Sequence, residues 1–375
     1  MLTAELAIAR ACETTGLNDF GDDPQGLKEG LQRTLEGVAK VPLTPRSWEG
    51  FEAKIVSDLS IRLRVEEYCK QNPEVLEQEI RGPVLITGIP RTGTTITMAL
   101  LALDPQFRFL RQWEALSPLP PPRLDEEPND PRAVAARKRA ANVDKSLHIS
   151  DPDGPEEDLF PTAGYDMKAY LGQFPMPQDF LDWWVGLDFN GFYAFHRKLL
   201  KILQSQRPPN FWVLKAPPHL FKLDAFTAQY PDSKVILTHR DPARIIPSDA
   251  SLRYNTALGT CEHEKLNKKD FGPSLLNWWS RGMDKALRDR AMIGEDRFAD
   301  VRNIDVVSDP VGTFKALYDR LGLAFDDARQ NAIEVFLETN YKGAHGSHEY
   351  TAEEYGLTEQ EIREEFSDYC ERFDL

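Results

Sequence analysis

The sequence predicts an α/β fold in which helices flank a parallel sheet and an N-terminal helical segment precedes it. Three short apolar runs, rich in β-branched or aromatic residues, carry this prediction: Pro83–Gly88, Phe211–Leu214 and Lys234–Thr238. Each run leads to proline, glycine or charged residues and then to a helical stretch, which is typical of buried parallel strands that alternate with helices. With 375 residues, 41% of them hydrophobic, the chain is long enough for one large domain with an appendage or for two domains.

The residues before the first apolar run are expected to be helical. Leucines recur at helical spacing between Leu27 and Leu35, and a further helix is expected from Trp48 to Cys69. Amphipathic stripes of this kind ordinarily bury themselves against one another, as in a helical cap. We therefore assign residues 1–80 to an N-terminal helical segment and residues 81–375 to the α/β domain.

The segments between and after the predicted strands differ in composition. Prolines crowd the stretch from Ser117 to Pro131, which is expected to be an ordered loop or lid without regular structure. Aromatic residues are dense from Asp158 to Phe195; most are expected in the core, and some are candidates for lining an apolar substrate pocket. Helices are expected at Pro310–Leu321 and Arg329–Leu337, followed by a loop from Tyr341 to Tyr350.

The overall charge argues against one class of partner. The net charge is −15 and the sequence pI is about 5.0, whereas a protein that binds nucleic-acid backbones usually carries a basic patch and a high pI. We expect no nucleic-acid partner, but an anionic cofactor is compatible with this charge because it needs only a local cluster of donors. No apolar run is long enough to predict a transmembrane segment.

The cysteines predict neither a metal site nor a disulfide framework. Cys12, Cys69, Cys261 and Cys370 are scattered, and no pair has metal-ligand spacing. The N-terminal residues also lack the basic region that opens a secretory signal peptide. We therefore expect a cytoplasmic protein.

The most informative motif is the turn that follows the first predicted strand. Gly88 and Gly93 allow the backbone to turn tightly and to approach a ligand without an intervening Cβ atom. The N–H groups of Thr92–Thr95 are expected at the start of the helix Ile96–Leu103, where unpaired donors and the helix dipole attract an anion. Thr94 and Thr95 add hydroxyl groups and Arg91 adds charge, so a P-loop-like phosphate site is predicted here.

Two further clusters follow the other predicted strands. Arg240 ends the strand at Lys234–Thr238 and precedes Ser248 by eight residues, which places a guanidinium and a hydroxyl where they could share one phosphate. Lys215 ends the strand at Phe211–Leu214 and is expected to point into the crevice where open α/β sheets bind their ligands.

Together these clusters resemble the sulfotransferases that use 3′-phosphoadenosine 5′-phosphosulfate (PAPS), most closely a bacterial branch related to the tyrosylprotein type. Pro90–Thr95 is similar to the 5′-phosphosulfate loop of that family, and Arg240–Ser248 is similar to its 3′-phosphate motif. The resemblance continues through Phe298–Gly322, through the basic-Gly loop at Tyr341–Gly343, and through the tail at His348–Leu357. It therefore covers most of the chain.

The resemblance implies a role for each cluster in moving a sulfuryl group from PAPS to a hydroxyl group in line, without a metal ion. The 5′-phosphate would be held by Arg91 and by the backbone amides of Thr92, Gly93, Thr94 and Thr95. Lys215 would neutralise charge on the bridging oxygen. The residues implied for the 3′-phosphate are Arg240, Ser248, Lys342 and Gly343.

The general base is less clearly marked. Glu114 follows the phosphate-loop helix at a distance similar to that of the catalytic glutamate in the tyrosylprotein type, although the gap is slightly longer here. The rival candidates are Glu156, Glu157 and His219. A carboxylate acts as a base near neutral pH when burial raises its pKa.

Two other functions compete with this interpretation. A P-loop kinase or NTPase would need a lysine directly after the second glycine of the loop, where Thr94 stands, and a later aspartate for Mg²⁺. A nucleotide-binding scaffold without catalysis would not need Lys215 or the acidic candidates. We expect a small hydroxylated, partly apolar acceptor such as a lipid, sterol or phenol, because the aromatic and proline-rich stretches favour an apolar pocket. A peptide tyrosine is less expected, because enzymes that sulfate tyrosine work in a secretory compartment and the chain shows no secretory signal.

Overall fold

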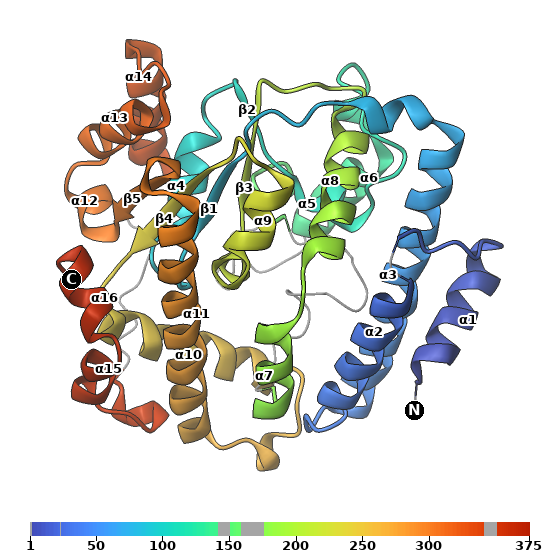
Figure 1. The fold of residues 1–375 in the computed structure, drawn as a ribbon, viewed down its shortest axis with the longest axis horizontal. Helices are drawn as coiled ribbons and strands as arrows, with labels where there is room; N and C mark the ends of the chain where they lie inside the picture. Colours follow the sequence, from blue (N-terminus) through green and yellow to red (C-terminus); the bar gives the residue numbers. More distant parts are fainter. Residues whose placement is uncertain (1, 23, 142–150, 159–175, 341–350) are drawn as a thin grey trace. The chain divides into compact units, whose positions relative to one another are not determined.

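The computed structural model describes residues 2–22, 24–141, 151–158, 176–340 and 351–375. Figure 1 labels the helices and strands along the chain. The chain divides into two compact units. The first comprises Met1–Ile80, Leu110–Pro209 and Thr256–Leu266, and the second comprises Arg81–Phe109, Asn210–Asn255 and Asn267–Leu375. Each unit is assembled from segments that are far apart in the sequence.

The first unit is helical. Its described helices are α1 (Ala4–Thr15), α2 (Pro24–Val38), α3 (Pro45–Gln71), α5 (Gln112–Leu116), α6 (Pro131–Ala141), α7 (Gln178–Gly186) and α8 (Asn190–Gln204). Helix α3 begins with Pro45 behind the N-cap Thr44, whose hydroxyl accepts a hydrogen bond from the Ser47 amide. Helix α1 packs against both α2 and α3. The helix expected from Trp48 to Cys69 is thus confirmed and is slightly longer.

The aromatic residues of this unit form core, as expected. Trp184, Phe189, Phe192 and Tyr193 are buried, and neighbouring ring centroids lie 5.0–5.3 Å apart. The part of the aromatic stretch at 159–175 lies outside the described residues. The proline-rich stretch is largely irregular, but it contains a short 3₁₀ turn at Glu127–Asn129 that the prediction excluded.

The second unit is built on a five-stranded sheet whose pairs are all parallel. The strand order is β2-β3-β1-β4-β5. The central strand, β1, is the one that precedes the predicted phosphate loop. The strands are β1 (Val84–Thr87), β2 (Phe107–Arg108), β3 (Phe211–Lys215), β4 (Lys234–His239) and β5 (Phe298–Arg302). All three predicted strands are confirmed within one or two residues.

Helices connect these strands and follow the last of them. They are α4 (Thr94–Leu101), α9 (Leu223–Gln229), α10 (Pro242–Leu258, whose last turn belongs to the first unit), α11 (Phe271–Ile293), α12 (Asn303–Ser308), α13 (Pro310–Leu321), α14 (Asp327–Asn340), α15 (Glu359–Glu365) and α16 (Ser367–Phe373). The expected helix Pro310–Leu321 is confirmed to the residue. The second expected C-terminal helix lies within α14.

The sheet is buried on both faces. On one face, Ile86 and Ile236 belong to an apolar cluster with residues of α4, α12, α13 and α14. The side chains of Leu85, Leu214 and Leu237 alternate with these and are also fully buried. Burial on both faces explains why these strands appear as continuous apolar runs in the sequence.

Two strands were not among the predicted apolar runs. Strand β2 has only two residues, and β5 carries Asp300 and Arg302 within its short length. Both lie at the edges of the sheet, where each has one strand neighbour. Among the described residues, no helix combines the length and the apolar character that crossing a membrane requires.

Candidate functional site

The predicted phosphate loop connects β1 to α4 in the second unit. Its backbone has positive φ at Gly88 (+149°), Arg91 (+71°) and Gly93 (+100°). Gly93 is the N-cap of α4 and offers the helix no side-chain cap, so the first N–H groups of α4 are not satisfied by a capping side chain. Such a helix start favours an anion.

Both glycines are required by their surroundings. A Cβ atom on Gly88 would lie 2.6 Å from the Thr238 hydroxyl oxygen, and one on Gly93 would lie 2.9 Å from the Asn303 side-chain nitrogen. Any side chain there would therefore displace a neighbour as well as strain the backbone. The predicted role of the two glycines in a tight cradle agrees with this geometry.

Substitution of Gly93 is expected to damage the cradle more than the fold. Gly93→Ala should cost about 1–3 kcal/mol of local strain and weaken binding of 3′,5′-ADP in a calorimetric titration. Gly322→Ala is the control, because Gly322 also has positive φ (+73°) but has nothing within 4 Å of its Cβ position. Equal nucleotide affinity in the two variants would contradict a phosphate site at this loop.

The hydroxyl group of Thr92 braces the loop from within. It donates a 2.7 Å hydrogen bond to the Ile89 carbonyl. The hydroxyl of Thr238 lies 2.5 Å from that of Thr92, and it also lies 3.3 Å from the Thr87 carbonyl oxygen at the end of β1. The side chain of Thr92 therefore joins the loop to β4, which leaves its backbone N–H as the group that can face a ligand.

The two predicted phosphate motifs meet in the structure. The Nε atom of Arg91 donates a 3.2 Å hydrogen bond to the Ser248 hydroxyl on α10. The Nη1 atom of Arg240, which follows β4, donates a 3.1 Å hydrogen bond to the Arg91 carbonyl oxygen. Residues about 150 positions apart thus form one cationic cluster with a hydroxyl group beside the start of α4.

Lys215 also lies at this edge of the sheet. It is the last residue of β3 and pairs in register with Ile86 of β1, one residue before that strand ends. The side chain is largely buried, with 6% of the residue exposed. The Thr87 hydroxyl donates to the Ala216 carbonyl at 3.0 Å, which fixes the end of β3 to the end of β1. An ammonium group is thus held at the carboxyl end of the central strands.

Two predicted 3′-phosphate residues, Lys342 and Gly343, lie outside the described residues. Among the described residues, no group of three or more His, Cys, Asp or Glu side chains is placed to hold a metal ion.

Two residues of this site were missed by sequence reasoning. Asn303 opens α12 directly after β5 and lies against Gly93, and Thr238 braces the loop. A polar residue at the carboxyl end of a parallel strand is a detectable signal once the strand is known. Strand β5, which precedes Asn303, was not predicted, and the position of Asn303 at the end of a strand was therefore not recognised.

Glu114 belongs to the first unit, where it is completely buried on α5. Its Oε2 accepts a 2.9 Å hydrogen bond from the Arg111 backbone N–H, and its Oε1 accepts a 2.8 Å bond from the Arg111 guanidinium. Arg111 also donates to Glu127 at 2.9 Å. Burial by itself lowers the pKa of Arg111, but the hydrogen bonds that it donates to the two carboxylates raise this pKa above its ordinary value. Glu114 is thus a carboxylate held in a fixed orientation.

The rival base candidates fall in both units. Glu156 lies in the first unit beside the start of α5, because its backbone N–H donates to the Leu110 carbonyl at 2.8 Å. Glu157 follows it, and both side chains are partly exposed. His219 lies in the second unit, four residues after Lys215, where it is fully buried in a 3₁₀ turn.

A comparison with known families identifies the family of the chain. The sulfotransferase family matches residues 83–327, which include the phosphate loop, Lys215 and the Arg240–Ser248 segment. The chain belongs to the sulfotransferase family. This confirms the predicted fold class, the sulfotransferase activity and PAPS as the sulfuryl donor.

Solved and curated sulfotransferases agree with this assignment. Sulfotransferase STF9 from Mycobacterium avium is 27% identical, superposes with a TM-score of 0.90, and the match covers 100% of this chain and 97% of that one. Sulfotransferase STF1 from Mycobacterium tuberculosis is 29% identical, with a TM-score of 0.85 and coverage of 98% and 99%. Omega-hydroxy-beta-dihydromenaquinone-9 sulfotransferase Stf3 from Mycobacterium bovis is 24% identical over 74% of this chain and 72% of its own length. The predicted resemblance to a bacterial branch is confirmed.

Proposed function

We propose that this sulfotransferase acts on a hydroxylated, partly apolar lipid, and that the residues gathered at the end of the sheet bind its donor. The proposed donor site is supported by the hydrogen bonds that link Arg91 to Ser248 and to Arg240 beside the start of α4. PAPS differs from ATP in having a second phosphate on the ribose, and two cationic groups next to a phosphate cradle suit such a ligand.

Different residues of the second unit bind the two phosphate groups of the donor. The amides of Thr92, Gly93, Thr94 and Thr95, with the guanidinium of Arg91, bind the 5′-phosphate. Arg240 and Ser248, together with the predicted Lys342 and Gly343, bind the 3′-phosphate. PAPS supplies the activated sulfuryl group, and the ammonium of Lys215 neutralises the charge that develops on the oxygen left behind.

Glu114 is our candidate for the base that accepts the proton of the acceptor hydroxyl. Its hydrogen bonds with Arg111 hold it in a fixed orientation, and each carboxylate oxygen has a second lone pair to offer. Pairing with an arginine also makes a carboxylate a weaker base. Glu156, Glu157 and His219 are the alternative candidates for the base.

The acceptor is proposed from the relative Stf3, whose name gives a hydroxylated menaquinone as substrate. We expect purified protein with PAPS to release 3′,5′-ADP fastest with a hydroxylated isoprenoid quinone presented in detergent micelles. Simple phenols and a tyrosine-containing acidic peptide are the comparison acceptors. Turnover confined to the peptide would contradict the lipid proposal, while leaving the donor site intact.

Arg240→Ala is expected to raise the KM for PAPS by about 10- to 100-fold. The variant loses one hydrogen bond between a charged side chain and a phosphate, and such a bond contributes about 1.5–3 kcal/mol. The same variant should lose most of its preference for 3′,5′-ADP over 5′-AMP in equilibrium binding. Arg244→Ala is the matched control, because Arg244 lies on the same segment with its side chain exposed. A KM for PAPS that is the same in both variants would remove Arg240 from the 3′-phosphate site.

We also propose a cytoplasmic location. The four cysteines are all free in the structure, which suits a reducing compartment. Fractionation of cells that express the protein, followed by immunoblotting, tests this, and recovery in an extracellular fraction would contradict it.

A further inference from the structure

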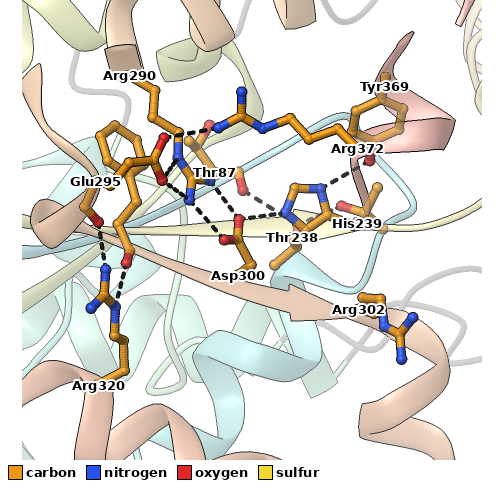
Figure 2. Close-up of polar contacts among 12 residues, drawn as sticks. Thr87, Thr238, His239, Arg290, Glu295, Asp300, Arg302, Arg320, Tyr369 and Arg372 are labelled. Atoms are coloured by element: carbon orange, nitrogen blue, oxygen red, sulfur yellow. Dashed lines mark hydrogen bonds and ion pairs between the residues drawn. The ribbon is translucent and has the colours of Figure 1, made fainter. Parts of the chain in front are cut away.

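A polar network centred on the buried side chains of His239 and Tyr369 connects the end of β4 to the C-terminal helix α16, directly beside Arg240. Figure 2 shows its centre, where the ring of His239 lies between the carboxylate of Asp300 and the hydroxyl of Tyr369. His239 is the residue before Arg240 and is completely buried. None of the proposed donor contacts uses this network.

The hydrogen bonds of His239 fix its tautomer. Its Nε2 lies 2.8 Å from the Asp300 Oδ1, and its Nδ1 lies 3.1 Å from the Tyr369 hydroxyl oxygen. A carboxylate only accepts, so the ring proton is on Nε2, and Nδ1 accepts the proton of the tyrosine. Burial lowers the pKa of His239 although Asp300 acts in the opposite direction, which agrees with a neutral ring. Every polar atom of the ring is therefore used.

Apolar packing holds the same ring. Phe373 of α16 stacks on His239, with ring centroids 3.8 Å apart and an angle of 20° between the planes. Helix α16 also places Arg372 2.8 Å from Glu295. Glu295 in turn binds Arg290, which donates to both oxygens of Asp300 at 2.7 and 2.8 Å. The C-terminal helix thus holds His239 through both polar and aromatic contacts.

The residue on the other side of Arg240 is held by the neighbouring helix. Asp241 accepts a 2.7 Å hydrogen bond from the guanidinium of Arg363 on α15. The other oxygen of Asp241 accepts from the Ala243 N–H at the start of α10. Arg240 therefore sits between two residues that each bind a different helix of the C-terminal pair.

We propose that α15 and α16 position Arg240 for the 3′-phosphate, with Tyr369 and Arg363 as the positioning residues. The inference rests on the proposed role of Arg240. The backbone at 239–241 cannot shift without breaking a buried histidine pair or the Asp241–Arg363 ion pair. A contact between a guanidinium and a phosphate depends on such placement, because misplacement by about 1 Å weakens it strongly.

The test measures the preference for 3′,5′-ADP over 5′-AMP by equilibrium binding to the full chain. Tyr369→Phe removes one hydroxyl group, and Arg363→Gln removes the partner of Asp241 at a side chain that is 45% exposed, so the fold tolerates it. Each variant should lower the preference by roughly three- to tenfold, the usual range for residues that act through a neighbour. Affinity for 5′-AMP should change little.

Tyr318→Phe is the matched control. Tyr318 is also buried in the second unit, and its hydroxyl donates to a carboxylate, that of Asp104, at 3.0 Å. Its loss should lower the melting temperature about as much as Tyr369→Phe does. A merely structural role would therefore move the melting temperature in both variants and the nucleotide preference in neither.

The outcomes separate the inference from the proposed function. If Arg240→Ala loses the preference while Tyr369→Phe and Arg363→Gln keep it, the positioning role is overturned and the donor site stands. If Arg240→Ala itself keeps the preference, the positioning role and the proposed 3′-phosphate role of Arg240 are both overturned. Adding Tyr369→Phe to Arg240→Ala should cause no further loss of preference, since nothing remains to be positioned. A further loss would show that Tyr369 acts by another route, against the inference.

Discussion

Lys215→Met is expected to reduce kcat by about 10²–10³, the effect of removing one group that stabilises transition-state charge in a dry site. The side chain lies at the carboxyl end of β3, beside the central strand, and is largely buried. Methionine fills a similar volume without the charge. Single-turnover release of 3′,5′-ADP measures the step directly, and binding of 3′,5′-ADP should change much less than kcat.

The control for this variant is Lys234→Met. Lys234 begins β4 and donates to the Asp296 carbonyl at 2.9 Å, so it sits at the amino end of the same sheet. Its loss should leave turnover unchanged. If Lys215→Met turned over at the rate of Lys234→Met, Lys215 would have no part in the transition state.

Glu114→Gln is expected to lower turnover by about 10²–10⁴, the usual contribution of a general base, with nucleotide binding intact. Glutamine at this position retains the hydrogen bond to the Arg111 backbone N–H, because either side chain completes such a cap. The variant thus removes basicity with little change to α5. Initial rates at saturating PAPS, together with a 3′,5′-ADP titration, separate catalysis from binding.

Glu127→Gln is the control, because Glu127 is the other carboxylate bound to Arg111. It should weaken stability without abolishing transfer. Near-full activity in Glu114→Gln would place the base elsewhere. Glu156→Gln, Glu157→Gln and His219→Gln would then identify it by which of them loses turnover.

Local signals in the sequence were sufficient for several elements. Helix α13 was predicted to the residue because Asp309 caps its start, Pro310 opens it and Gly322 ends it in a left-handed conformation. The central strands were predicted because burial on both faces requires a continuous apolar run. The phosphate loop was predicted because its glycines and threonines are adjacent in the chain.

The remaining features depend on partners that are distant in sequence. The local pattern did not predict strand β5 because Asp300, in its middle, is a charged residue; only its pairing with His239 and Arg290 explains a carboxylate there. The contact between the hydroxyl groups of Thr92 and Thr238, which lie 146 positions apart in the chain, is likewise visible only in the folded protein.

The sequence by itself determined the fold class, the phosphate loop and the kind of chemistry, because these depend on residue types at short spacing. Only the tertiary structure decided that Arg91 and Ser248, 157 positions apart, share a hydrogen bond. It also decided that Glu127 shares Arg111 with Glu114, and that the C-terminal helices hold the residues on either side of Arg240. The physical reason is that strand order and helix packing, which no local pattern encodes, bring these groups together.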